Sequence, residues 1–177
     1  SIYRGSEEDV LLRVLETARA FRGEVIAELT GDCPLIDPQM IDRSVEMYQS
    51  GDYDYVSTGL ERTYPRGWDV DVFSTNALEE VNRITADPTD HEHVSLYIAE
   101  HPEWYKLGAI KAPKELMGPD LRLCVDTAED YQVVKAIYDA LYPKNPAFTD
   151  YEVMRFLKEN PRIASLNEKI QQKKVRL

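Results

Sequence analysis

The sequence predicts an α/β domain in which a mainly parallel sheet is covered by helices on both faces. Three observations support this fold class: apolar runs alternate with segments of helical periodicity, capping residues precede most of those segments, and no internal repeat or linker interrupts them. The chain has 177 residues, 43% of them hydrophobic, which suffices for one domain with a sizeable core. We expect that domain over residues 1–145, followed by a C-terminal helix and basic tail over residues 146–177.

The helices are predicted from capping residues followed by apolar side chains at helical spacing. Ser6 is expected to cap the first helix, which Gly23 ends. Asp37 and Pro38 begin the second, which stops near Gly51. Four further helices are predicted over residues 75–84, 89–98, 128–141 and 149–158.

The strands are predicted from short apolar or alternating runs. The first run, "VIAEL" at residues 25–29, is expected to be mostly buried, whereas "DVDVF" at residues 69–73 alternates with period two. Three further strands are predicted at "YDYVS" (53–57), "WYKLGAI" (104–110) and "LRLCV" (121–125). Alternation of such strands with helices is typical of a parallel sheet.

The composition excludes several classes of protein. Acidic residues outnumber basic ones, 32 to 21, so the net charge is −11, which argues against nucleic-acid partners and anionic membrane surfaces. The two cysteines, Cys33 and Cys124, form no disulfide framework and no Cys-x-x-Cys pair, so a reducing, cytoplasmic setting is expected. No apolar run approaches about 18 residues, and the first residues lack the regions of a signal peptide.

The segment "TGDCP", residues 30–34, lies where the first predicted strand gives way to a helix. Ligands of open α/β sheets bind beyond the carboxyl ends of the strands, which is where Asp32 is expected. Gly31 would allow a sharp turn or the close approach of a ligand, and Pro34 would stop the strand. The segment alone fits an ordinary turn equally well, because Gly, Asp and Pro are common turn residues.

A second segment, "LCVDTAED", repeats this arrangement. Asp126 follows an apolar run, and Thr127 is expected to cap the next helix with Asp130 at the capping-box position. Taken alone, Asp126 could simply be the neighbour of a helix cap. Together, Asp32 and Asp126 could share one Mg²⁺, which proteins hold by one or two carboxylates plus substrate phosphates.

The chain resembles the cytidylyltransferase family of spore coat polysaccharide biosynthesis, which is related to the synthetases of CMP-activated acidic sugars. The resemblance runs in order from about Tyr3 to about Leu141. It is carried by "YRGSEEDVLLRV", "TGDCPLIDP", "DYVST", "ERTYPRGWDVDVF", "DHEHVSLYI" and "LCVDTAEDYQVVKAIY".

The resemblance implies a Rossmann-like fold of the nucleotide-diphospho-sugar transferase type. It implies Mg²⁺-dependent transfer of CMP from CTP to a sugar in surface polysaccharide biosynthesis, with Asp32 and Asp126 holding the metal as the catalytic pair and Gly31 beside them. It also implies a homodimer formed through an arm near residues 100–118, where Trp104 and Met117 lie. The sequence does not identify the sugar.

Two positions depart from the family pattern. Such enzymes open with a strand and a Gly- and Arg-containing loop that grips the triphosphate, and no such loop precedes the first predicted helix here. We therefore expect a missing N-terminal βαβ unit, which would measure about 30 or more residues, or alternatively a degenerate protein. Glu28 stands where relatives often carry Arg.

Four further residues are candidates for substrate binding. Arg62 and Arg66, in "ERTYPRGWD", could hold phosphate or a sugar carboxylate, although most arginines are simply solvated. Asp71 could accept a sugar hydroxyl, although period-two alternation alone would place it on a wet strand face. His91, in the first turn of a predicted helix, could help bind a sugar carboxylate or serve as an ordinary helix-start residue.

Two alternative functions remain open from the sequence. Asp69 and Asp71 form an Asp-x-Asp motif, which can bind metal in glycosyltransferases that use sugar nucleotides. A chain without the triphosphate loop could instead be a non-catalytic nucleotide- or sugar-binding assembly module.

Overall fold

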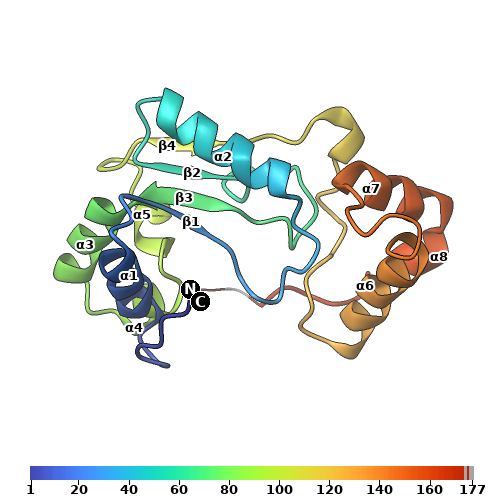
Figure 1. The fold of residues 1–177 in the computed structure, drawn as a ribbon, viewed down its shortest axis with the longest axis horizontal. Helices are drawn as coiled ribbons and strands as arrows, with labels where there is room; N and C mark the ends of the chain where they lie inside the picture. Colours follow the sequence, from blue (N-terminus) through green and yellow to red (C-terminus); the bar gives the residue numbers. More distant parts are fainter. Residues whose placement is uncertain (174, 176–177) are drawn as a thin grey trace.

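The computed structural model describes residues 1–173 and 175. A four-stranded sheet with strand order β1-β3-β2-β4 lies at the centre of the larger lobe (Figure 1). The strands are β1 (Val25–Glu28), β2 (Tyr55–Ser57), β3 (Asp71–Ser74) and β4 (Leu107–Ala109). The α/β class is as predicted.

The sheet is mixed, so the prediction of a mainly parallel sheet is wrong. β3 lies between β1 and β2 and pairs antiparallel with both, and only β2 and β4 pair in parallel. A parallel connection usually needs a helical crossover, but no helix separates β2 from β3. The intervening loop returns the chain in the opposite direction, which places β3 antiparallel to its neighbours.

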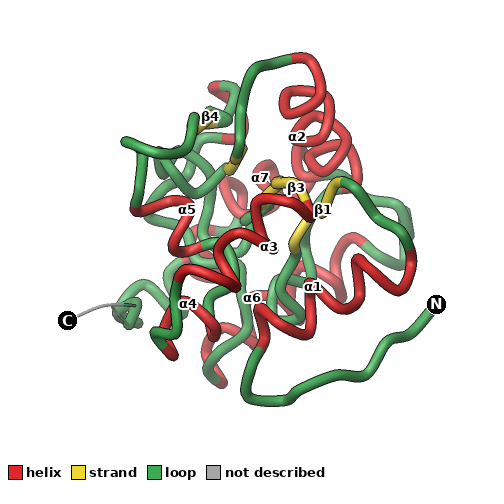
Figure 2. The backbone as a smooth tube through the Cα atoms, turned by 90° about the vertical axis from the view of Figure 1, so that its left-hand side faces the viewer, coloured by secondary structure: helices red, strands yellow, loops and turns green. Residues whose placement is uncertain are grey.

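Helices cover both faces of the sheet, as predicted. α2 packs on the face formed by Val56 and Val72, whereas α1 and α3 pack on the face formed by Tyr55 and Phe73. Figure 2 shows α1, α3 and α4 gathered on this second side. The helices are α1 (Val10–Phe21), α2 (Pro38–Ser50), α3 (Thr75–Ile84), α4 (Pro88–Glu92), α5 (Leu96–Glu100), η1 (a 3₁₀ turn, Lys114–Leu116), α6 (Ala128–Leu141), α7 (Asp150–Glu159) and α8 (Pro161–Ala164).

Local capping explains most helix starts. Asp37 caps α2 with Pro38 in the first turn, and Thr127 and Asp130 form the predicted capping box of α6. The cap of α1 is Asp9 rather than Ser6, whose hydroxyl accepts the Asp9 N–H at 3.0 Å. The Ser6 prediction therefore misplaces that helix start by three residues.

The helix predicted over residues 89–98 is broken into α4 and α5. Val94 lies between them with a φ of 45°, a left-handed conformation that a β-branched residue rarely adopts. Its side chain is nevertheless buried against α1 and α3, so packing overrides the helical pattern.

The strand predicted over residues 121–125 does not form. The segment instead makes one isolated bridge, between Arg122 and Arg66, and donates the Val125 N–H to the Asp32 carbonyl at 2.8 Å. Because its partners are two different loops, no continuous ladder can form. Leu123 and Cys124 of the run are buried and Leu121 and Val125 are partly buried, so the run has the apolar pattern of a strand.

The core crosses from the sheet to the C-terminal helices. Val153 and Leu157 of α7 belong to the same buried cluster as Val56 and Val72 of the sheet, so α7 packs on the first part of the chain. β1 is the most exposed strand, because it lies at the sheet edge, with Val25 37% exposed rather than mostly buried as predicted.

No helix in the described part of the chain has both the length and the apolar character that a membrane span requires.

Candidate functional site

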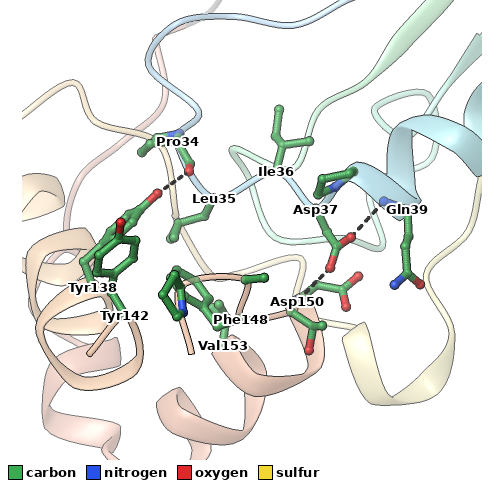
Figure 3. Close-up of a pocket in the computed structure, with 14 residues that line it drawn as sticks. Pro34, Leu35, Ile36, Asp37, Gln39, Tyr138, Tyr142, Phe148, Asp150 and Val153 are labelled. Atoms are coloured by element: carbon green, nitrogen blue, oxygen red, sulfur yellow. Dashed lines mark hydrogen bonds between the residues drawn. The ribbon is translucent and has the colours of Figure 1, made fainter. Parts of the chain in front are cut away.

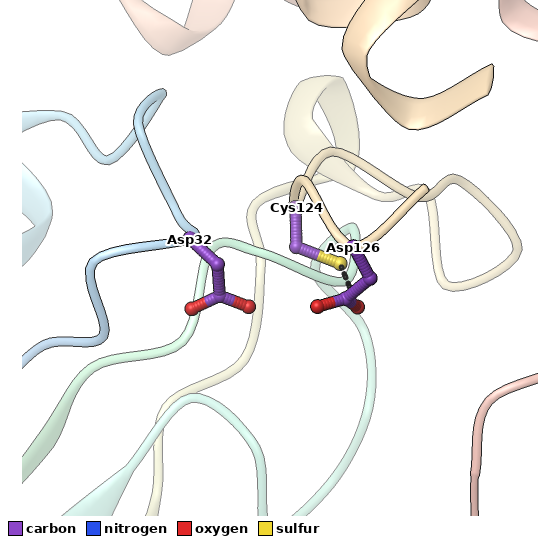
Figure 4. A group of neighbouring side chains, drawn as sticks. All are labelled: Asp32, Cys124 and Asp126. Carbon is purple, nitrogen blue, oxygen red and sulfur yellow. Dashed lines mark hydrogen bonds between the residues drawn. The ribbon is translucent and has the colours of Figure 1, made fainter. Parts of the chain in front are cut away.

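Asp32 and Asp126 converge although they lie almost a hundred residues apart in sequence. One ligand atom from each of Asp32, Cys124 and Asp126 lies within 4.8 Å of the other two (Figure 4). Asp32 is half-buried, Cys124 is buried and the Asp126 side chain is 47% exposed. The cluster is therefore open to solvent on the Asp126 side.

Backbone contacts between loops bring the two carboxylates together. The Asp32 carbonyl accepts the Val125 N–H at 2.8 Å, and the Arg66 carbonyl accepts the Leu123 N–H at 2.7 Å. Gly67 makes this approach possible, because a Cβ there would lie 2.4 Å from the Cys124 nitrogen, and its φ is +94°. The loop "TYPRGW" thus supports the loop that carries Asp126.

The residues of this cluster fit Mg²⁺. Carboxylate oxygens are the ligands that Mg²⁺ prefers, and two of them with remaining positions for water and phosphate is its usual protein environment. Burial raises the pKa of the Cys124 thiol to about 11, so the sulfur stays protonated and is a poor ligand. Asp32 and Asp126 would hold the ion, as the resemblance implies.

Arg122 positions Asp126, and the sequence reasoning missed it. Its buried guanidinium contacts the Asp126 carboxylate through Nη2 and donates from Nε to Asp130 at 2.9 Å. Asp130 is fully buried and also accepts the backbone N–H groups of Asp126 and Thr127 at 3.1 Å. A single cation inside the apolar run "LRLCV", four residues before Asp126, was the signal available in the sequence.

The same network holds the C-terminal tail. The Gln172 side-chain oxygen accepts from Nη1 of Arg122 at 2.5 Å. Buried Asn167 donates to the Arg122 carbonyl at 2.9 Å and to Asp130 at 2.8 Å. Although burial opposes ionisation of Asp130, these hydrogen bonds and the Arg122 charge outweigh it and lower its pKa. The tail is thereby tied to the loop that carries Asp126.

The two arginines predicted to bind substrate differ. Arg62 is engaged by the protein itself, because its Nη1 lies 2.5 Å from the Asp69 carboxylate. Arg66 forms no ion pair within residues 1–173 and 175, is half-buried, and lies next to Arg122 through the backbone bridge. Burial and the neighbouring Arg62 lower the pKa of Arg66. Arg66 is thus the better placed of the two to meet an anion.

Asp71 does not lie on a wet strand face. It pairs with Glu28 across β1 and β3, and it accepts the Tyr55 hydroxyl at 2.7 Å. Burial raises the pKa of Asp71. Burial and, to a smaller degree, the Asp71 charge raise the pKa of Glu28 to about 8, and among the described residues Oε2 of Glu28 has no hydrogen-bond partner.

This carboxylate pair makes the stability of the fold depend on pH. Folded Glu28 keeps its proton up to about pH 8, whereas an unfolded Glu releases it near its ordinary pKa of 4.5, so stability falls as pH rises between those values. At pH 9, Glu28→Gln should raise the free energy of unfolding by roughly 2–4 kcal/mol. At pH 4 the two proteins should be alike. Urea unfolding at both pH values, with the exposed Glu24→Gln as control, measures this, and equal pH profiles would refute it.

Both ring nitrogens of His91 contact other parts of the protein. Its Nδ1 lies 2.8 Å from the Asp9 carboxylate and its Nε2 lies 3.1 Å from the Thr85 carbonyl, so both ring nitrogens are occupied. Burial lowers its pKa, but these hydrogen bonds outweigh burial and raise it. His91 thus links α1 and α4, and its role as a sugar ligand stays a prediction. The sequence could not reveal this link, because Asp9 lies 82 residues away.

Gly31 and Cys33 flank Asp32. A Cβ added at Gly31 would meet no atom within 4 Å, so the backbone there is open to solvent or to a ligand. Cys33 is buried, and burial raises the pKa of its thiol to about 12, which fits an unreactive packing residue.

A separate cavity of about 420 Å³ lies where α2, α6 and α7 meet (Figure 3). Its buried Asp37 accepts the N–H groups of Gln39 at 2.8 Å and Asp150 at 3.2 Å. Asp150 in turn lies 3.5 Å from Arg43. Asp37 thus joins the N-termini of α2 and α7, whereas Oδ2 of Asp150 has an ion-pair contact with Arg43 but no hydrogen-bond partner among the described residues.

Comparison with known proteins finds relatives along almost the whole chain. The family profile described as cytidylyltransferase matches residues 1–175. The chain is 35% identical over 170 residues to the spore coat polysaccharide biosynthesis protein SpsF of Bacillus subtilis, covering 94% of this chain and 68% of that protein. An uncharacterized protein of Methanocaldococcus jannaschii is 32% identical over 176 residues, covering 99% and 70%. A solved cytidylyltransferase structure from Leptospira borgpetersenii superimposes with a TM-score of 0.85 at 31% identity, covering 98% and 71%.

Proposed function

The chain belongs to the cytidylyltransferase family, and from that premise we propose that it transfers CMP from CTP to an acidic sugar, releasing pyrophosphate, in surface polysaccharide synthesis. The observation that carries the proposal is the convergence of Asp32 and Asp126 within 4.8 Å at an open edge of the fold. The relation to a spore coat polysaccharide protein supports the sugar as acceptor.

The reaction is an in-line displacement at phosphorus. The sugar hydroxyl oxygen forms a bond to the α-phosphorus of CTP, the bond from that phosphorus to the bridging oxygen breaks, and pyrophosphate leaves with the electron pair. The hydroxyl proton is released to water. Phosphoryl transfer requires positioning and charge stabilisation rather than a covalent protein intermediate.

The residues of the cluster would divide this work. Asp32 and Asp126 would hold Mg²⁺, which when bound neutralises charge on the phosphates. Arg122 fixes the Asp126 carboxylate in place through its second contact with Asp130. Arg66 would meet an anionic group of a substrate, because the protein supplies it with no carboxylate partner among the described residues.

The glycosyltransferase alternative has less support. Asp69 is paired with Arg62 and accepts the Gly67 N–H at 2.8 Å, and Asp71 is bound by Tyr55. Neither carboxylate belongs to the metal-competent group found in the described residues. An assay of pyrophosphate release from CTP plus acidic sugar, beside hydrolysis of UDP- and CMP-sugars, tests the proposal. Sugar-nucleotide hydrolysis without CTP turnover would contradict it, and CTP binding without turnover would favour the assembly module.

The contribution of Arg66 can be measured in the same assay. Arg66→Gln should raise the KM of one anionic substrate by roughly tenfold, because one charge-assisted hydrogen bond is lost. The melting temperature should change little. Arg62→Gln serves as the matched control, because it removes an equal charge that Asp69 already neutralises. If the two variants changed KM equally, Arg66 would be an ordinary surface charge rather than a substrate-binding residue.

We also propose a homodimer through residues 100–118. Trp104 is 62% exposed and Met117 is 50% exposed, and Trp104 extends a ring stack in which His101 lies 3.9 Å from Tyr97 and 4.9 Å from Trp104. Rigid exposed aromatics and Met are enriched in interface cores. Light scattering at high micromolar concentration tests this, and a monomeric mass would contradict it.

A further inference from the structure

A second cavity, of about 440 Å³, adjoins the Asp126 side of the candidate site. Thr89, Glu92 and His93 at the end of α4 form the α4 wall, and Arg122 and Asp126 also line the cavity. The tail wall consists of residues 170–173 and 175. The volume is within the range of small-molecule pockets.

The tail wall is fixed in place rather than merely lying near the site. Figure 1 shows the chain leaving α8 and running back towards α4 across the molecule. Asn167 and Gln172 bind Arg122, the residue that also positions Asp126. Any ligand in the cavity would therefore contact the same network that holds the candidate catalytic carboxylate.

The side chains around the cavity suit a polyhydroxylated ligand. Hydroxyls of Thr89 and Thr127, amides of Gln171 and Gln172, and the Glu92 carboxylate offer mixed donors and acceptors. Sugar hydroxyls, which both donate and accept, match this set.

Two nitrogen-bearing side chains line the cavity from different segments of the chain. Lys173 lies on the tail wall and His93 on the α4 wall, and neither forms an ion pair in the part of the chain that the structure describes. We propose that this cavity binds the acceptor sugar, and that Lys173 and His93 bind its carboxylate and so determine the choice of an acidic sugar. The proposal rests on the proposed function and assigns its second substrate a place and two specificity residues.

The position of the cavity agrees with the chemistry. Because Asp126 lines it, a hydroxyl of a bound sugar can lie beside the carboxylate pair where the α-phosphate would be held. Neutral sugars would lack the group that Lys173 and His93 recognise. The tail then acts as a determinant of specificity and not only as a cover.

Ligand-observed NMR of the 177-residue chain tests this without requiring turnover. The probes are N-acetylneuraminate, 3-deoxy-octulosonate and glucuronate, each compared with its methyl ester and with neutral N-acetylmannosamine. We expect at least one acid to bind, and Lys173→Gln and His93→Gln each to weaken that binding at least fivefold while changing binding of the ester less than twofold. Lys169→Gln, an exposed tail lysine that lies outside the cavity, is the matched control and should have no effect.

The outcomes separate this inference from the proposed function. The assignment of the cavity would be overturned if none of the acids bound at concentrations on the order of 10 mM. It would also be overturned if Lys169→Gln and Lys173→Gln had equal effects, even if CMP transfer is observed. Loss of acid binding in the Lys173 and His93 variants would support it even if CTP turnover fails.

Discussion

Asp126→Asn is expected to reduce the rate of CMP transfer by roughly 10²–10³-fold, the usual effect of removing one group that stabilises transition-state charge. The substitution keeps the size of the side chain but removes half of the charge that Asp32 and Asp126 bring together. Folding should be little affected, because Asp126 is about half-exposed and Arg122 retains its contact with Asp130. Initial rates of pyrophosphate release and the melting temperature, measured in a form that turns over CTP, check both expectations.

Exposed Asp120→Asn is the matched control for the loss of one negative charge. It should leave the rate unchanged within about twofold. If Asp126→Asn were equally active, the carboxylate pair would not take part in the reaction. If both rate and melting temperature collapsed, the effect would be structural, and Asp126→Glu would then distinguish the two roles by partial recovery of rate.

The second large effect concerns the open edge of β1. Within the described residues β1 pairs only with β3, and a groove of about 370 Å³ runs along it beside α1. Phe21 is 52% exposed and Leu29 is 43% exposed at this groove. An open apolar edge is a ready template for a further strand. A further strand paired with β1 would cover this edge.

We therefore expect CTP turnover to require a strand on this edge. These 177 residues with the edge unpaired should show none, and a version extended by fusing the first βαβ unit of a cytidylyltransferase relative should gain it. Two carboxylates repel a triphosphate. Backbone N–H groups and cations outside the carboxylate pair must therefore bind it. The extension should also raise the melting temperature by roughly 5–10 °C, because a few kcal/mol of added burial shifts a domain of this size by that amount. Turnover of CTP by the 177-residue chain itself would contradict the prediction and would require a triphosphate grip inside it.

Local features of the chain could be predicted well, and long-range ones could not. The starts of α2 and α6 follow from Asp37-Pro38 and from Thr127 with Asp130, where the cap and its partner lie within one turn. The antiparallel insertion of β3 depends on which strands pair, and no local pattern specifies that. The apolar run before Asp126 was mistaken for a strand because burial, not pairing, gives it its pattern.

The candidate site shows the same division. Asp32 and Asp126 could be singled out because each follows an apolar run and precedes a capped helix. Arg122 was missed because its partners Asp130 and Gln172 are identified only by folding. For His91 the sequence left a sugar ligand and an ordinary helix-start residue open, because Asp9, which contacts it, lies far away in the sequence.

Direct measurement of divalent-metal binding tests the central claim, that Asp32 and Asp126 form one metal site. Mn²⁺ can report on this site by electron paramagnetic resonance, with Mg²⁺ as competitor. The account predicts one Mn²⁺ site in the 177-residue chain, displaced by Mg²⁺ and weakened at least roughly tenfold by either Asp32→Asn or Asp126→Asn, because each variant removes one of the two carboxylate ligands. Unchanged Mn²⁺ affinity in both variants, with Asp120→Asn as the control, would contradict it.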